Sequence, residues 1–179
     1  KLYLEHPFYI SMATSLALIK TLQSFSIPKL SIKWPNDILS EDKKICGILI
    51  ENVIKQNRLR ASIIGVGLNV NQTDFEGLPK AASLKLLLGN TFNLEEVLYT
   101  LIKYLKYYFM FLRKEEYDFI KREYESFLFR KNKPSTFRDV EGVSFSGIIK
   151  NVSSSGSLQV LIEDDIIKDF DFKDLTLLY

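Results

Sequence analysis

The sequence is poor in the residue types on which many catalytic and metal sites depend. Its 179 residues include one cysteine, Cys46, and one histidine, His6. A single cysteine excludes an internal disulfide and a zinc site built from cysteines, and we expect Cys46 to be a small core residue. With His6 as the only histidine available as a base, serine or cysteine hydrolase chemistry is disfavoured. We assign no residue as a metal ligand.

Long apolar runs and a strong charge are also missing. The sequence has no run of 18 or more apolar residues and no signal-peptide pattern, so we expect no membrane-spanning helix and a cytoplasmic location. The net charge of +2 divides into +5 over residues 1–131 and −3 over residues 132–179, which is too small to indicate nucleic-acid binding. A hydrophobic content of 46% predicts a globular protein with one large or two small domains.

The most informative part of the chain begins with Lys33-Trp34-Pro35-Asn36-Asp37. Residues 30–34 alternate between apolar and polar, which predicts a half-buried strand with Lys33 near its end. Pro35 restricts the preceding residue to an extended conformation and favours a turn, for which Asn36 is well suited. Lys33 is therefore expected on a rigid strand end, although a solvated lysine before an ordinary turn would give the same pentapeptide.

Two β-rich runs follow, Lys44–Val53 and Arg58–Val70, joined by the polar turn Lys55-Gln56-Asn57. This arrangement predicts an antiparallel hairpin. Gly47 leaves one position near the start of the first run without a side chain. Lys44, just before it, is placed to face a phosphate, although a solvated charge is the commoner meaning of a surface lysine.

The second run carries glycine on one side only. Alternate residues from Ile64 onward are apolar, and the opposite side carries Gly65, Gly67, Asn69 and Asn71. Glycine weakens a strand, so two on one side need a reason. One interpretation is a floor without side chains, on which a ligand approaches the backbone and hydrogen-bonds the two amides. The alternatives are β-bulges or a crowded strand crossing.

The rest of the chain predicts three helices and a β-rich tail. The helices are expected over Pro7–Phe25, after an Asn93 cap, and over about Glu115–Phe127, and Ser83 is expected to cap a shorter one. Short alternating stretches separated by tight turns over residues 132–179 predict a small β-barrel. The apolar stripe expected to be buried in the second helix consists of Val97, Leu98, Leu101, Ile102, Leu105, Tyr108, Phe109 and Leu112.

Three stretches together resemble the catalytic core of biotin protein ligases, whose pattern reads Lys-Trp-Pro-Asn-Asp, Lys-x-x-Gly-Ile-Leu-x-Glu and Gly-x-Gly-x-Asn. They are residues 33–37, 44–51 and 65–69, and the resemblance extends from about Phe8 to Tyr179. It implies an α/β (α+β) fold: a class II synthetase-like catalytic domain with a mostly antiparallel sheet and helices over residues 1–131. It also implies a small C-terminal SH3-like β-barrel over residues 132–179.

The resemblance further implies a reaction and its site. Members of the family use ATP with Mg²⁺ to convert biotin to biotinyl-adenylate. They then transfer biotin to a lysine of the biotin carboxyl carrier protein of a carboxylase, and a homodimer is compatible with the resemblance. Lys33 matches the family's catalytic lysine. The implied biotin- and adenylate-binding residues are Lys33, Asn36, Asp37, Lys44, Gly47, Ile48, Gly65, Gly67, Asn69 and Asn71.

One part of the family pattern is not in the printed sequence. Upstream of the region matching Phe8, the family carries a Gly-Arg-Gly-Arg-x-Gly-Arg loop and a Ser/Thr-rich segment, whereas this sequence opens with residues 1–4, Lys-Leu-Tyr-Leu. We therefore expect the printed segment by itself not to be a competent ligase. The alternatives are a non-catalytic remnant or assembly module of the same fold, and a lipoate–protein ligase relative, which the Trp-Pro-Asn-Asp continuation disfavours.

Overall fold

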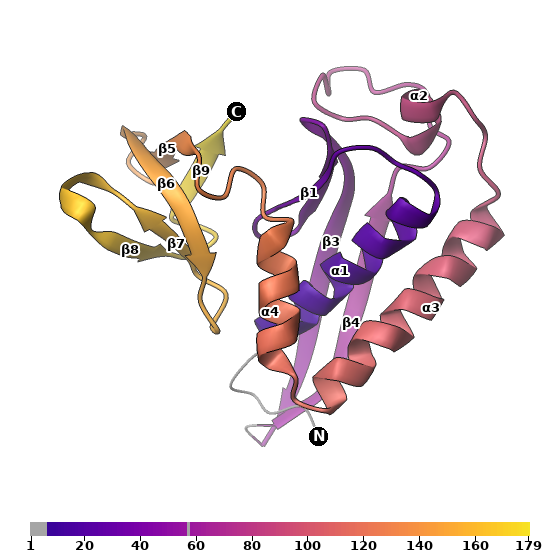
Figure 1. Ribbon diagram of the computed structural model, residues 1–179, viewed down its shortest axis with the longest axis horizontal. Coiled ribbons are helices and arrows are strands. Elements are labelled where there is room, and N and C mark those ends of the chain that lie inside the picture. The colour runs from indigo at the N-terminus through magenta and orange to yellow at the C-terminus, as the bar shows by residue number, and fades with distance from the viewer. Residues whose placement is uncertain (1–6, 57) are drawn as a thin grey trace.

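The computed structural model describes residues 7–56 and 58–179, so His6, Asn57 and the opening residues 1–4 considered above lie outside the described residues. The described chain is a mixed α/β structure with two antiparallel sheets, ordered β1-β2-β3-β4 and β8-β7-β6-β5-β9 (Figure 1). The predicted fold class is thereby confirmed.

The first sheet consists of β1 Leu30–Lys33, β2 Asp37–Ser40, β3 Lys43–Lys55 and β4 Arg58–Leu68. The helices are α1 Phe8–Ser24, α2 Leu84–Leu88, α3 Leu94–Arg113 and α4 Tyr117–Ser126. The second sheet consists of β5 Pro134–Asp139, β6 Ser144–Val152, β7 Leu158–Leu161, β8 Ile167–Phe170 and β9 Leu175–Leu178, with a short 3-10 turn, Glu163–Asp165.

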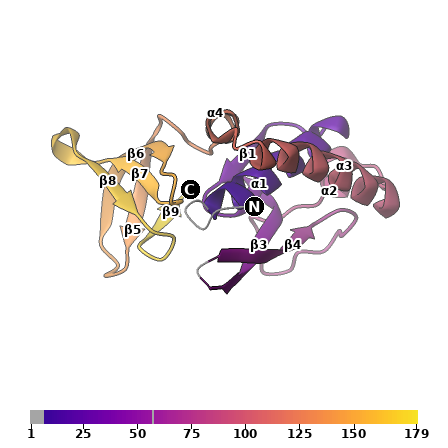
Figure 2. The same cartoon turned by 90° about the horizontal axis from the view of Figure 1, so that it is seen from below.

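Helix α1 lies at the centre of the larger layer. It packs against α3 and α4 and also contacts β1, β2 and β3. Figure 2 shows α1, α3 and α4 on one side of β3 and β4, so within residues 7–56 and 58–179 these helices cover one face of the sheet. Most of α1 is buried, because it is enclosed by helices and sheet together, and its core residues include Ile10, Leu16, Ile19 and Leu22.

The hairpin predicted from the sequence forms as β3 and β4, with an antiparallel register that pairs Cys46 with Leu68 and Val53 with Ala61. A strand that the sequence did not reveal, β2, lies between β1 and β3. It begins at Asp37, so Asp37 is a strand residue and not part of the turn. Cys46 is 1% exposed, and burial raises the pKa of its thiol to about 12, as expected of an unreactive core residue.

Helix α3 departs from its predicted burial. Its cap is as predicted, since the Asn93 side chain accepts hydrogen bonds from the backbone N–H groups of Glu95 and Glu96. However, Leu98 is 56% exposed and Ile102 is 41% exposed, so the prediction that both are core residues is wrong. The reason is that α3 packs against α1 and α4 along one side, and this contact is narrower than the apolar stripe.

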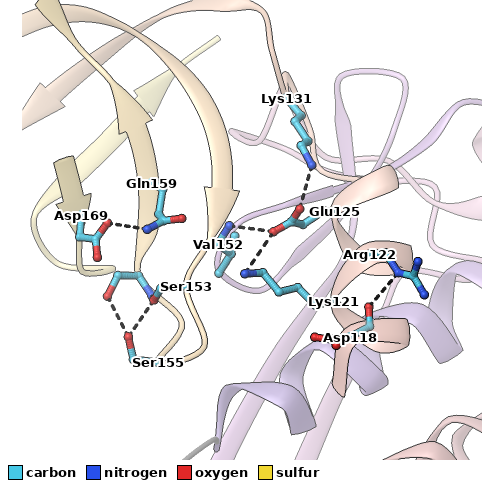
Figure 3. Close-up of polar contacts among 11 residues, drawn as sticks. Asp118, Lys121, Arg122, Glu125, Lys131, Val152, Ser153, Ser155, Gln159 and Asp169 are labelled. Atoms are coloured by element: carbon cyan, nitrogen blue, oxygen red, sulfur yellow. Dashed lines mark hydrogen bonds and ion pairs between the residues drawn. The ribbon is translucent and has the colours of Figure 1, made fainter. Parts of the chain in front are cut away.

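The second sheet is joined to α4 through a buried carboxylate (Figure 3). Glu125 of α4 accepts a hydrogen bond from the backbone N–H of Val152 in β6 at 3.2 Å, and Lys131 Nζ lies 2.8 Å from the same carboxylate. Buried residues of both sheets belong to one hydrophobic cluster. The predicted domain division between residues 131 and 132 falls in the segment between α4 and β5, and it stays a prediction.

None of the helices in the described part of the chain combines the length and the apolar character needed to cross a membrane.

Candidate functional site

One row of residues crosses all four strands of the first sheet. Lys33 of β1 pairs with Asp37 of β2, Asp37 pairs with Gly47 of β3, and Gly47 pairs with Gly67 of β4. Residues directly opposite one another in antiparallel strands share a face of the sheet. The structure therefore brings a cation, an anion and two positions without side chains into one line, although they come from separate parts of the sequence.

The charged end of this row is a compact cluster. Lys44 Nζ lies 2.6 Å from Asp37 Oδ1, and Lys33 Nζ lies 3.8 Å from Asp37 Oδ2. The side chains of Asp37 and Lys33 are 15% and 22% exposed. Two ammonium groups thus share one largely buried carboxylate, which leaves a positive charge that a second anion can satisfy.

Lys33 is electrostatically perturbed. Burial lowers its pKa, Asp37 opposes this effect by favouring the charged form, and Lys44 and Lys80 lower the pKa further through repulsion. A desolvated ammonium interacts more strongly with a ligand anion than an ammonium in bulk water does. Lys33 is also held at the end of β1, because it is paired there with Asp37 of β2.

The glycine end of the row is open above the backbone. A Cβ built on Gly67 would meet only the carbonyl oxygen of Gly47, at 3.7 Å, and one on Gly65 would meet Leu49 at ordinary contact distance. The register is continuous here, because the shift in this hairpin lies between Val53 and Ile54. Neither a β-bulge nor a crowded crossing therefore explains these glycines, and the structure has a bare floor at this place.

The predicted site amides have structural partners. Asn36 Nδ2 donates to the carbonyl of Ile48, whose own N–H donates to the carbonyl of Asn36, both at 2.9 Å, so the turn is fastened to β3. Asn69 Nδ2 donates to the carbonyl of Ala82 at 3.1 Å. Asn71 bonds both backbone groups of Phe92, donating to its carbonyl and accepting from its N–H. These bonds hold the segment after β4 in place, and a role of the amides in ligand binding stays a prediction.

Ile48 and Asn36 also line a hollow of about 230 Å³ beside the turn. Ile48 is 4% exposed and contributes to the apolar wall. The hollow's polar groups include the hydroxyls of Ser11 and Ser15 from α1. A small, mostly apolar hollow with a few polar groups is the usual form of a small-molecule subsite.

Two residues near Lys33 were not found from the sequence. The Tyr179 ring lies with its centroid 5.0 Å from Lys33 Nζ and 4.0 Å from Lys80 Nζ. Lys80 belongs to the irregular segment after β4, and its backbone carbonyl accepts a hydrogen bond from the N–H of Lys44 at 2.7 Å. Nothing in the local pattern around either residue indicates that both lie beside Lys33.

The chain is similar to known proteins in sequence and in fold. Residues 3–69 match the model of the biotin/lipoate A/B protein ligase family. Over 63 residues, 35% of this chain, the sequence is 40% identical to the bifunctional ligase/repressor BirA of Bacillus subtilis. It is 37% identical over 79 residues to the biotin–[acetyl-CoA-carboxylase] ligase of Mycobacterium tuberculosis, over 42% of this chain. These matches span 19% and 28% of the two relatives, so the chain matches less than a third of their length.

The fold has close structural counterparts. The apo structure of the biotin protein ligase of Aquifex aeolicus superposes with a TM-score of 0.79 at 24% identity, covering 98% of this chain and 76% of that one. The same enzyme in complex with biotin and ATP gives a TM-score of 0.79 at 23% identity, covering 97% and 72%. At these identities the likeness establishes the shared fold, and it extends over the second sheet as well as the first.

Proposed function

We propose that this chain is a biotin protein ligase, whose site joins biotin to ATP and passes the biotinyl group to a protein lysine. In the first step a carboxylate oxygen of biotin bonds to the α-phosphorus, and the bond to the β-phosphate oxygen breaks, releasing pyrophosphate. In the second step the amine of a carrier lysine bonds to the acyl carbon and releases AMP. The observation that carries this proposal is the row of Lys33, Asp37, Gly47 and Gly67 across the sheet.

Lys33 is assigned the electrostatic role in the first step. Two anions, a carboxylate and a phosphate, must approach one another, and charge builds on the phosphoryl oxygens in the transition state. A fixed, partly desolvated ammonium offsets that charge without reorganisation, and such preorganisation is usually the largest catalytic contribution. Asp37, 3.8 Å from the Lys33 ammonium and 2.6 Å from that of Lys44, keeps both groups close to the floor.

The glycine floor is assigned the positioning role. A ligand lying on Gly67 can contact the strand backbone directly, and at Gly47 it would meet the Lys44 ammonium, which lies 3.4 Å from the place of a Cβ. Positioning two reactants in this way supplies much of the rate acceleration of phosphoryl chemistry, which needs little covalent help from the protein. The apolar hollow beside Asn36 and Ile48 adds a place for an uncharged ring system.

Mg²⁺, which the family uses, does not fit the protein groups described here. The two oxygens of Asp37 lie 2.6 and 3.8 Å from lysine nitrogens, and the described residues contain no group of three or more His, Cys, Asp or Glu side chains arranged for a metal. We therefore assign no step to a metal held by these side chains.

The protein partner is proposed to be a biotin carboxyl carrier domain, whose lysine receives biotin. The catalytic domain and the SH3-like domain are proposed to divide between residues 131 and 132.

The proposal is tested by biotin-dependent exchange of labelled pyrophosphate into ATP, which reports the first step alone. The full-length protein, from the natural reading frame that contains this sequence, should support exchange with biotin and not with lipoate. Lys33→Ala should slow exchange by about 100-fold, since one preorganised donor is worth ~3 kcal/mol. Lys29→Ala is the matched control, because the Lys29 side chain is 75% exposed and pairs with Glu41 away from the row.

The outcomes separate the alternatives. Exchange with lipoate in place of biotin would support the lipoate–ligase alternative. A folded protein that shows no exchange with either acid would support a non-catalytic module of the same fold. A folded Lys33→Ala protein with the exchange rate of the wild type would remove Lys33 from the chemistry.

A further inference from the structure

We propose that Lys80 and Tyr179 extend the site into a polyphosphate subsite, in which Lys80 binds the β and γ phosphates of ATP and the Tyr179 ring holds the Lys33 and Lys80 ammonium groups ready for them. The inference rests on the proposed function, because it names further residues for the same nucleotide. It arises from the convergence of two lysines, Lys33 and Lys80, on one aromatic ring, with Lys44 joined to Lys33 through Asp37.

The first argument is geometric. Lys80 Nζ lies 4.0 Å from the Tyr179 ring centroid, and Lys33 Nζ lies 5.0 Å from it, both within the range of a cation–π contact. Lys44 belongs to the same group, since it pairs with Asp37, which also faces Lys33. Ammonium groups from β1, β3 and the segment after β4 therefore form one chain of contacts, in which Tyr179 links Lys80 to Lys33 and Asp37 links Lys33 to Lys44.

The second argument is that these positions are fixed by the fold. The Lys80 carbonyl accepts from Lys44 N–H, and the N–H of Ala82 donates to the Lys44 carbonyl at 3.0 Å, so the segment that carries Lys80 is bonded to β3 on both sides of Ala81. Tyr179 packs edge-to-face on Phe129, with ring centroids 5.2 Å apart. Phe129 is itself tied to β1, because its N–H donates to the Ile32 carbonyl at 2.8 Å.

The third argument concerns charge. Lys33 shares the single Asp37 carboxylate with Lys44, whereas the described ion pairs include none at Lys80, whose contact is the Tyr179 ring. An aromatic face stabilises a cation and leaves its full charge available. Burial and the nearby carboxylates of Asp37 and Asp42 raise the pKa of Tyr179, so its hydroxyl stays neutral and cannot act as a competing anion. The ring thus compensates the lysines for lost water while the cluster stays cationic.

The chemistry that such a cluster recognises is a polyphosphate. A single α-phosphate is served by Lys33 alone, whereas Lys80 approaches the ring from a different segment and adds a cation beyond Lys33. Lysine binds phosphate oxygens as a point charge through three donors, so it suits the mobile terminal phosphates of a nucleotide and the pyrophosphate product. Lys80 and Tyr179 should accordingly distinguish ATP and pyrophosphate from AMP and biotin.

The test is isothermal calorimetry on the full-length protein with four probes: ATP, inorganic pyrophosphate, AMP and biotin. Lys80→Ala should raise the dissociation constants of ATP and pyrophosphate about tenfold and leave those of AMP and biotin within about twofold. Tyr179→Leu should have the same selective effect, whereas Tyr179→Phe, which keeps the aromatic face, should bind all four probes like the wild type. Lys29→Ala removes an equal charge elsewhere and should change none of them.

Each outcome bears on the inference separately from the proposed function. Equal weakening of AMP and ATP by Lys80→Ala would overturn it, as would unchanged ATP and pyrophosphate affinity in both Lys80→Ala and Tyr179→Leu. If Tyr179→Leu fails to fold, Lys80→Ala and Tyr179→Phe still decide, because selective weakening by the first and normal binding by the second are both required. A wild-type protein that binds biotin but neither ATP nor pyrophosphate overturns the inference. A wild-type protein that binds none of the four overturns the proposed function with it.

Discussion

Replacing Gly67 with valine should block ligand binding while leaving the protein at least as stable. A Cβ at this position would meet only the Gly47 carbonyl oxygen, at 3.7 Å, so the substitution creates no clash inside the protein. Valine favours extended backbone and glycine does not, and the scale of strand preference spans about 1 kcal/mol. For a chain of this size such a gain raises the unfolding temperature by about 2–4 °C.

The loss of binding follows from the same geometry. A ligand in contact with the bare backbone at Gly67 has no space for two additional methyl groups, and overfilling a packed contact typically costs about 1–3 kcal/mol. The dissociation constant for biotin, or for a non-hydrolysable analogue of biotinyl-adenylate, should therefore rise about 5- to 150-fold. Thermal unfolding and calorimetry on the same preparation measure the two effects together.

A matched control lies on the same face of the same strand. Ala61 is an exposed residue of β4 opposite Val53, six positions from Gly67 and so about 20 Å away along the strand. Ala61→Val adds the same type of side chain away from the floor and should bind ligand normally. The reasoning is refuted if folded Gly67→Val binds with the affinity of the wild type, or if Ala61→Val weakens binding equally.

Two further predictions concern the charged groups. Asp37→Asn removes the carboxylate that favours the charged form of Lys33, so the pKa of Lys33, already lowered by burial, should fall further. The alkaline limb of the pH profile of pyrophosphate exchange should then move to lower pH, and an unmoved limb would show that Lys33 ionisation does not control that step. Glu125→Ala leaves the N–H of Val152 and the ammonium of Lys131 without their buried partner, and urea unfolding should show a loss of about 2–3 kcal/mol, with faster proteolysis within residues 129–134. Lys121→Ala, which removes only a group 4.0 Å from Glu125, should stay within about 0.5 kcal/mol, and equal effects of the two variants would contradict this role of Glu125.

Much of the site could be predicted from short-range pattern. Strand alternation fixes which residues share a face, so the sequence alone placed Gly65 and Gly67 opposite the apolar side of β4. The alternating pattern and Pro35 likewise predicted that Lys33 ends a strand and that a turn follows. The Asn93 and Ser83 caps are confirmed for the same reason, because a cap is a bond between a side chain and backbone groups two or three residues away.

Other features depended on partners far along the chain. Strand β2 has four residues and no strong pattern of its own, and it forms because β1 and β3 supply hydrogen bonds on both sides. The burial of Leu98 and Ile102 depended on how α1 and α4 lie against α3, which helical spacing does not specify. The hydrogen bonds of Asn71 with both backbone groups of Phe92 likewise depend on the fold of the segment between these residues, and the ligand-binding role of Asn71 stays a prediction.

The sequence by itself therefore predicted the likeness to biotin protein ligases, the hairpin, the strand end at Lys33 and the side of β4 without side chains. Only the tertiary structure decided that Asp37 stands between Lys33 and Lys44, that Gly47 faces Gly67, and that Lys80 and Tyr179 meet beside them. The physical reason is one of range. Backbone periodicity and turn chemistry act over a few residues and can be read directly, whereas strand order and loop closure are selected by the packing of the whole core.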